Sequence, residues 1–145
     1  MSRFVFGTLM LAALATAAVH ADVSPAGVFG DHMVLQSDRP LPFWGTARPD
    51  EPVKVTLAGR TGTTRADARG RWKLTLPAFS SGGPHQVTLT GDNTITFSDV
   101  LIGEVWVCSG QSNMAWPVSR AMDAEQEIAA ADHPRIRLLT VTRRV

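Results

Sequence analysis

The chain has 145 residues and a nearly balanced charge, with 14 Lys and Arg residues against 13 Asp and Glu residues. This balance provides no basic surface for nucleic acid, and a hydrophobic content of 44% is too high for a disordered protein. The single cysteine, Cys108, excludes an internal disulfide, and no Cys or His lies at a spacing that would complete a zinc site with it. We therefore expect a globular protein without a bound metal.

The first 21 residues have the organisation of a secretory signal peptide. Arg3 forms a short positive region, residues 4–19 are apolar, and small residues form a cleavage site that ends at Ala21. The apolar run has at most 16 residues, whereas a membrane span needs roughly 20. A retained membrane anchor is the alternative. We expect cleavage before Asp22 and export to the periplasm or the extracellular medium, with no membrane attachment afterwards.

Between Asp22 and about Asp99 the apolar residues recur with a period of two. Each run has one apolar face and one face rich in Thr and Lys, which is typical of an antiparallel strand with one buried side. The clearest runs are 53–57, 72–76, 87–90 and 94–98, with further strands near 33–36, 41–47 and 63–68. Turn-forming residues separate them at 48–50, 58–62, 69–70, 81–84 and 91–93. The pattern predicts an all-β accessory domain over 22–100, a sandwich of the jelly-roll or immunoglobulin-like kind.

Four side chains of this segment could take part in binding or catalysis. Trp44 and Trp72 could form a platform on which a sugar ring stacks, but burial in the core is the favoured interpretation because large aromatic residues dominate core burial. His32 and His85 have no second ligand or carboxylate at an informative spacing. We interpret both as ordinary loop or strand residues.

A different pattern begins at residue 100. Residues 100–108 are almost continuously apolar, which is typical of a strand covered on both faces. Residues 121–131 have helical spacing that ends before Pro134, and residues 135–141 alternate like a second strand. The order of strand, turn, helix and strand predicts the first βαβ unit of an α/β domain, over residues 101–145.

The turn after the first of these strands contains Ser112. A serine at the carboxyl end of a strand in an open α/β sheet lies where ligands bind in such folds. Gly110 permits a sharp turn, and the backbone N–H of Ser112 could stabilise an oxyanion. By spacing alone, however, a serine that caps a helix is the stronger interpretation.

A longer string around this serine carries a family resemblance. Residues 103–117 read GEVWVCSGQSNMAWP, which closely resembles the nucleophile block of the sialate O-acetylesterase family. These proteins are SGNH-type ester hydrolases whose first block reads Gly-Gln-Ser-Asn. FGDHMVLQ at 29–36, WGT at 44–46 and GGP at 82–84 are similar to the β-rich N-terminal domain of that family. The resemblance covers about residues 28–141.

The resemblance implies a fold, an activity and a site. It implies that residues 101–145 begin a three-layer, flavodoxin-like SGNH domain, here truncated, and that Ser112 is the nucleophile. Gly110 and Gln111 would then shape the turn, and Asn113 would either fix the start of the helix or line the site. The implied substrate is a sialic acid or another acetylated sugar. A serine with a base and an oxyanion hole suffices for ester cleavage, so no cofactor is expected.

The general base of an SGNH esterase has no counterpart in this chain. The family places that histidine three residues after an aspartate near the far end of the catalytic domain, whereas Asp132 and His133 are adjacent and stand where a helix stops. We therefore expect the chain to be the N-terminal portion of a longer enzyme and to be inactive by itself. The alternative is a noncatalytic carbohydrate-binding or spacer β-domain that carries only a remnant of the nucleophile block.

Overall fold

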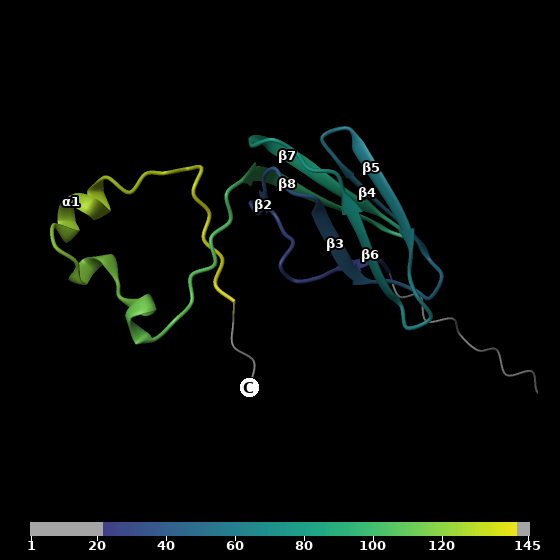
Figure 1. Cartoon of the computed structure of the whole chain (residues 1–145), viewed down its shortest axis with the longest axis horizontal. Helices are drawn as coiled ribbons and strands as arrows, with labels where there is room; N and C mark the ends of the chain where they lie inside the picture. Colours follow the sequence, from purple (N-terminus) through teal and green to yellow (C-terminus); the bar gives the residue numbers. More distant parts are fainter. Residues whose placement is uncertain (1–21, 142–145) are drawn as a thin grey trace, which may run out of the picture.

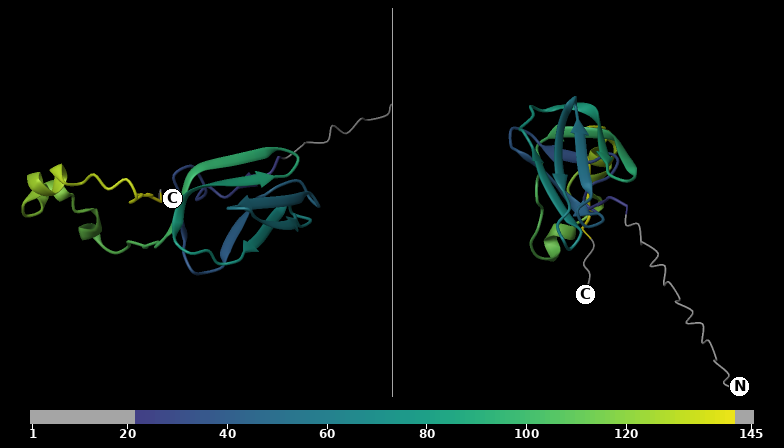
Figure 2. Two further views of the ribbon diagram at one scale, coloured as in Figure 1. Left: turned by 90° about the horizontal axis from the view of Figure 1, so that it is seen from above. Right: turned by 90° about the vertical axis from the view of Figure 1, so that its right-hand side faces the viewer.

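The computed structural model of the chain describes residues 22–141, so the predicted signal peptide lies outside the described residues. Two β-sheets lie against each other and enclose an apolar core, as the two layers in Figures 1 and 2 show. The smaller sheet has the strand order β1 (Ser24–Pro25), β3 (Leu41–Thr46) and β6 (Arg71–Leu76). The larger sheet has the order β2 (Val34–Gln36), β8 (Thr94–Gly103), β7 (Gly82–Thr90), β4 (Pro52–Leu57) and β5 (Arg60–Arg65).

The strands pair antiparallel with one exception, because β2 runs parallel to β8. The core comes from the alternation in the sequence. In β4 and β6, every second residue is buried and the residues between them are mostly exposed. The side chains that are almost completely buried include Phe43, Val53, Val55, Leu57, Leu76, Val87 and Leu89. The predicted β-sandwich is therefore confirmed.

Two predicted turns differ in the structure. Ala58 and Gly59 alone connect β4 to β5, with φ angles of 47° and 76°, so Leu57 pairs with Arg60 and β5 begins earlier than predicted. Two central residues with positive φ match the twist of a tight hairpin. The second difference is the stretch from Gly82 to Pro84, which belongs to β7. The pairing of β7 with β8 shifts register between Gly82 and Val87, so this stretch stays in the strand and forms no separate turn.

Gly45 in β3 leaves room for the first strand. A Cβ atom at this position would fall on the carbonyl oxygen of Ser24 and lie 2.8 Å from Cα of Pro25. Gly45→Ala is therefore expected to push β1 off the sheet and to lower the free energy of unfolding by about 1–3 kcal/mol. Urea denaturation of residues 22–145 measures this change. Gly27→Ala is the control because a Cβ there meets no atom within 4 Å, and an equal effect of both variants would contradict the explanation.

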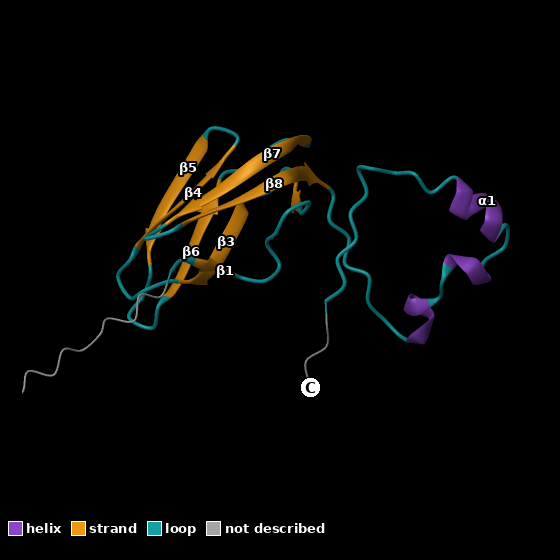
Figure 3. Ribbon diagram, turned by 180° about the vertical axis from the view of Figure 1, so that it is seen from behind, coloured by secondary structure: helices purple, strands orange, loops and turns teal. Residues whose placement is uncertain are grey.

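Residues 104–141, named the C-terminal arm below, leave the sandwich at the end of β8 and return to it (Figures 1 and 3). The arm contains three short helices, η1 (Ser112–Ala115), η2 (Val118–Arg120) and α1 (Ala124–Ala129). None of the helices within residues 22–141 is both long and apolar enough to cross a membrane.

The predicted βαβ unit is not formed in the arm. The strand expected over 100–108 ends at Gly103, α1 is shorter than the helix expected over 121–131, and residues 135–141 form no strand. Residues 100–102 are buried in the sandwich, with β2 and β7 on either side of β8. Beyond Gly103 no described strand continues this pairing, and Trp106 and Val107 are 84% and 90% exposed. Without neighbouring strands, the backbone N–H and C=O groups of an apolar segment have no partners with which to form a sheet.

Candidate functional site

Ser112 lies in a tight turn at the start of η1. Gln111 has an extended backbone before this helix, and its carbonyl oxygen accepts a hydrogen bond from the N–H of Met114 at 3.0 Å. The carbonyl oxygen of Asn113 accepts from the N–H of Trp116 at 3.1 Å. These bonds close the chain around the serine, which is exposed. The predicted sharp turn at this position is therefore present, although no sheet supports it.

The conformation of Gly110 explains the glycine in this turn. Its φ angle of 154° is one that residues with a side chain rarely adopt, and a Cβ atom would lie 3.1 Å from Cγ of Met114. The backbone two residues before Ser112 thus adopts a conformation that only glycine takes without strain. This geometry is compatible with a role of Gly110 in shaping the turn, which stays a prediction.

The serine has no base beside it in residues 22–141. No hydrogen bond between these residues joins the hydroxyl of Ser112 to a histidine or a carboxylate. The carbonyl oxygen of His133 accepts from the N–H of Ile136 at 2.9 Å, as in an ordinary turn. The side chains of Gln111 and Asn113 are exposed, and nothing among the described contacts separates the two roles considered for Asn113. Within the same residues, no three His, Cys, Asp or Glu side chains lie together as metal ligands would.

The sandwich and the arm meet at the end of β8. The amide side chain of Gln36 bonds to both Glu104 and Val105, and the hydroxyl of Ser37 donates to Glu104 Oε1 at 3.3 Å. Ser37 is buried, and its N–H donates to the carbonyl oxygen of Gly103 at 2.8 Å. These contacts join two strings singled out in the sequence, although the sequence assigned no role to Gln36 or Glu104.

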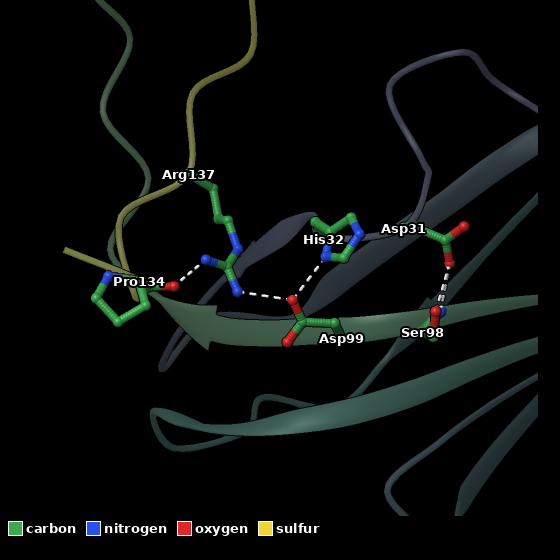
Figure 4. A network of polar contacts seen from close by, with 6 residues as sticks. All are labelled: Asp31, His32, Ser98, Asp99, Pro134 and Arg137. Carbon is green, nitrogen blue, oxygen red and sulfur yellow. Dashed lines mark hydrogen bonds and ion pairs between the residues drawn. The ribbon is translucent and has the colours of Figure 1, made fainter. Parts of the chain in front are cut away.

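A second group of polar contacts links the arm back to the sandwich (Figure 4). His32 Nδ1 lies 2.6 Å from Asp99 Oδ2, and Nη2 of Arg137 donates to the same oxygen at 2.7 Å. The neighbouring Asp31 accepts from both the N–H and the hydroxyl of Ser98. His32 lies in an exposed turn, as interpreted, but it is not isolated, because a carboxylate 67 residues away in the sequence is its partner.

The Asp99 contacts make a prediction about pH. The hydrogen bond from His32 and the charge of Arg137 hold the pKa of Asp99 below its usual value of 3.8. A carboxyl whose pKa is lower in the folded protein stabilises the fold above its usual pKa, and this contribution is lost as the pH falls through the lowered value. We therefore expect the Asp99 carboxylate to keep its contact with Arg137 until the pH falls below the usual pKa of an aspartate. Carboxyl NMR titration tests this, and His32→Ala should move the Asp99 pKa toward its usual value; an unchanged titration would contradict the assignment.

The two tryptophans of the sandwich have different environments. Trp72 is 3% exposed, and its indole N–H donates to the carbonyl oxygen of Thr46 at 3.0 Å, so its interpretation as a core residue is confirmed. Trp44 is 41% exposed and stands edge-on to Phe29. The core interpretation is wrong for Trp44, which lines an open groove on the smaller sheet together with Lys73. The reason is its place in β3, where the side chain falls on the outer face.

Comparison with known proteins places these features in a family context. The chain is 33% identical over 130 residues to the sialate O-acetylesterase of Mus musculus and 35% identical over 130 residues to that of Homo sapiens, covering 81% of this chain in each case. A carbohydrate acetylesterase of known crystal structure from Xanthomonas citri is 40% identical over 77% of this chain, with a TM-score of 0.73. No protein-family model matches the chain.

The similar proteins are much longer than the matched region. The chain spans 24% and 25% of the mouse and human proteins, and 26% of the Xanthomonas citri protein. Within that span, the resemblance to the sialate O-acetylesterase family is confirmed.

Proposed function

We propose that this chain belongs to a carbohydrate acetylesterase in which Ser112 is the nucleophile. The observation that carries the proposal is the Gly-Gln-Ser-Asn block, which forms an exposed turn next to a glycine with a positive φ angle, in a chain similar to sialate O-acetylesterases. A nucleophilic serine must be exposed to its substrate and held by backbone geometry, and Ser112 meets both requirements.

The proposed reaction proceeds through an acetyl-enzyme. The Ser112 oxygen attacks the acetyl carbonyl while a histidine outside this chain removes its proton, and the backbone N–H of Ser112 donates to the oxyanion that forms. The tetrahedral intermediate then collapses, so that the sugar oxygen leaves with the proton from the histidine. Water activated by the same histidine attacks the acetyl group, which releases acetate and restores the serine. The scheme requires no metal or organic cofactor.

The proposal divides the chain into two parts. Residues 22–100 form an accessory β-sandwich, and residues 101–145 begin the SGNH esterase domain, with the first three of these residues completing β8. We propose that the βαβ unit forms when the remaining strands of that domain cover the arm. The exposed side chains support this, because Leu138 and Val141 are 95% and 81% exposed at positions that the predicted second strand would bury.

The substrate class follows from the relatives. The mouse and human proteins are sialate O-acetylesterases, and the Xanthomonas citri protein is a carbohydrate acetylesterase. We propose an O-acetylated sialic acid or another acetylated sugar as the substrate. Acetate release from both kinds of sugar tests the proposal, using residues 22–145 alone and a longer protein that contains them. The longer protein should release acetate and residues 22–145 almost none. Enzyme-like turnover by residues 22–145 alone would contradict the proposal that the general-base histidine lies outside this chain.

A noncatalytic role for the sandwich is the second candidate. It is favoured by Trp44, whose exposed ring lies in a groove with Lys73 and Arg71, as an aromatic and polar surface for a sugar would. The Trp44→Ala variant should then no longer be retained on an acetylated polysaccharide, while its acetate release from a small acetylated sugar should equal that of the wild-type protein. Equal retention of the wild-type protein and the variant would eliminate this second candidate.

Export is the last part of the proposed function. Cleavage after Ala21 would give a mature protein that begins at Asp22 and is released to the periplasm or the medium. The intact mass of the exported protein tests this directly. A protein that retains Met1 and sediments with the membrane fraction would contradict it.

A further inference from the structure

Gln36 continues the pairing between two strands after their backbones separate. The parallel ladder of β2 and β8 ends where Gln36 pairs with Gly103. Beyond that point the Gln36 side chain makes the hydrogen bonds between the two segments. Its Oε1 accepts from the N–H of Val105 at 3.0 Å, and its Nε2 donates to Glu104 Oε2 at 3.2 Å. Ser37 adds a second hydrogen bond to the Glu104 carboxylate. One amide side chain thus fixes the direction in which the arm leaves the sandwich.

Arg137 attaches the arm at its returning end. Its side chain is 24% exposed, whereas the apolar residues on either side, Ile136 and Leu138, are 63% and 95% exposed. This is the reverse of the usual order, in which the charged side chain is in solvent and the apolar ones are covered. The guanidinium contacts the Asp99 carboxylate and also donates to the carbonyl oxygen of Pro134 (Figure 4). The charged residue is therefore the one that holds this end of the arm.

We infer that Gln36 and Arg137 are positioning residues that fasten the two ends of residues 105–136 to one end of the sandwich. This segment carries Ser112, so the inference rests on the proposed function. None of its side chains is buried, and its own short helices give it little rigidity. Two fixed ends restrict where the serine can lie, whereas a single attachment would leave the segment free to swing. The sandwich would in this way position the nucleophile.

The bonds themselves suit this role. The Asp99 contact is charge-assisted, and His32 holds the same carboxylate oxygen from the other side. His32 and Gln36 both lie in the FGDHMVLQ string, and each contacts β8 or the residues that directly follow it. FGDHMVLQ, which resembles the family outside the nucleophile block, is thus a part of the sandwich that contacts the arm and the strand leading into it.

Hydrogen exchange on residues 22–145 tests the first attachment without any enzyme activity. Gln36→Ala removes the acceptor of the Val105 N–H and should raise the exchange rate of that amide roughly five- to tenfold, the factor for losing one hydrogen bond. Gln86→Ala is the matched control, because Gln86 is an exposed glutamine of β7 with no described side-chain hydrogen bond. Equal exchange of Val105 in both variants would overturn the role of Gln36.

Proteolysis and kinetics test the second attachment. Arg137→Ala should raise the cleavage rate within 105–136 at least fivefold, and Arg135→Ala, an exposed arginine two residues earlier, should not. In a longer acetylesterase that contains this chain, Arg137→Ala should lower kcat, normalised to the amount of reactive serine, with little change in KM. Arg137→Lys should restore part of the lost kcat. Unchanged cleavage and unchanged kcat would overturn the inference. Loss of the proposed function would appear separately, as activity that does not depend on Ser112.

Discussion

Under the proposed function, replacement of Ser112 by alanine is expected to lower acetate release from an acetylated sugar by roughly a thousandfold or more, measured in a longer protein that contains this chain. The alanine has no oxygen to attack the carbonyl, so only binding and the oxyanion donors would contribute to the rate that remains. The measurement is the initial rate of acetate release, with KM determined in the same experiment. Because the turn is closed by backbone hydrogen bonds of Gln111 and Asn113, the variant should keep its fold.

Ser119→Ala is the matched control for this variant. Ser119 is an exposed serine of η2 in the same arm, and it lies outside the Gly-Gln-Ser-Asn block. Its replacement should leave kcat unchanged. If the Ser112 variant keeps most of the activity while both proteins remain folded, the nucleophile is another residue.

Replacement of Glu51 by alanine is expected to destabilise the sandwich by about 3 kcal/mol. The side chain is 1% exposed, and its two oxygens accept from the N–H of Arg48 at 2.9 Å and from the N–H of Asp92 at 2.7 Å. The carboxylate therefore joins its own loop to the loop that contains Asp92, 41 residues later in the sequence. Alanine would leave both N–H groups without an acceptor in a buried site, and each such group costs about 1–3 kcal/mol.

Urea denaturation of residues 22–145 measures the Glu51 effect. Glu51→Gln should cost less than alanine because it keeps the volume and one acceptor oxygen. Glu125→Ala, which removes an exposed glutamate of α1, should change the free energy of unfolding by less than about 0.5 kcal/mol. A loss below about 1 kcal/mol for Glu51→Ala would show that water or a neighbouring group replaces the carboxylate.

The strands of the sandwich were predictable because their information is local. The alternation in β4 and β6 marks one face for burial, and both strands appear within a residue of the predicted bounds. The hairpin between β4 and β5 was placed less well, since Ala58 adopts a positive φ that its residue type does not announce. The exposed position of Trp44 depends on which face of β3 it occupies, and a bulky aromatic residue alone does not reveal this.

The arm was less predictable because its structure depends on partners. The apolar run over 100–108 predicted one strand with both faces covered, but only residues 100–102 are buried, within the sandwich. His32 and Arg137 join Asp99 across 67 and 38 residues of sequence, and no local pattern marks such pairs. Ser112 could be proposed from the sequence for the opposite reason, since a contiguous string of residues carries the family resemblance.

The direct test of the central claim is to trap the acetyl-enzyme. A longer protein that contains this chain is mixed with an acetylated sugar, quenched in acid within the first turnovers, digested and analysed by mass spectrometry. The proposed function predicts an acetyl group on the peptide that contains Ser112, and no such group in the Ser112→Ala variant. An acetyl group on a different residue, or turnover in a Ser112→Ala variant at the wild-type rate, would contradict it.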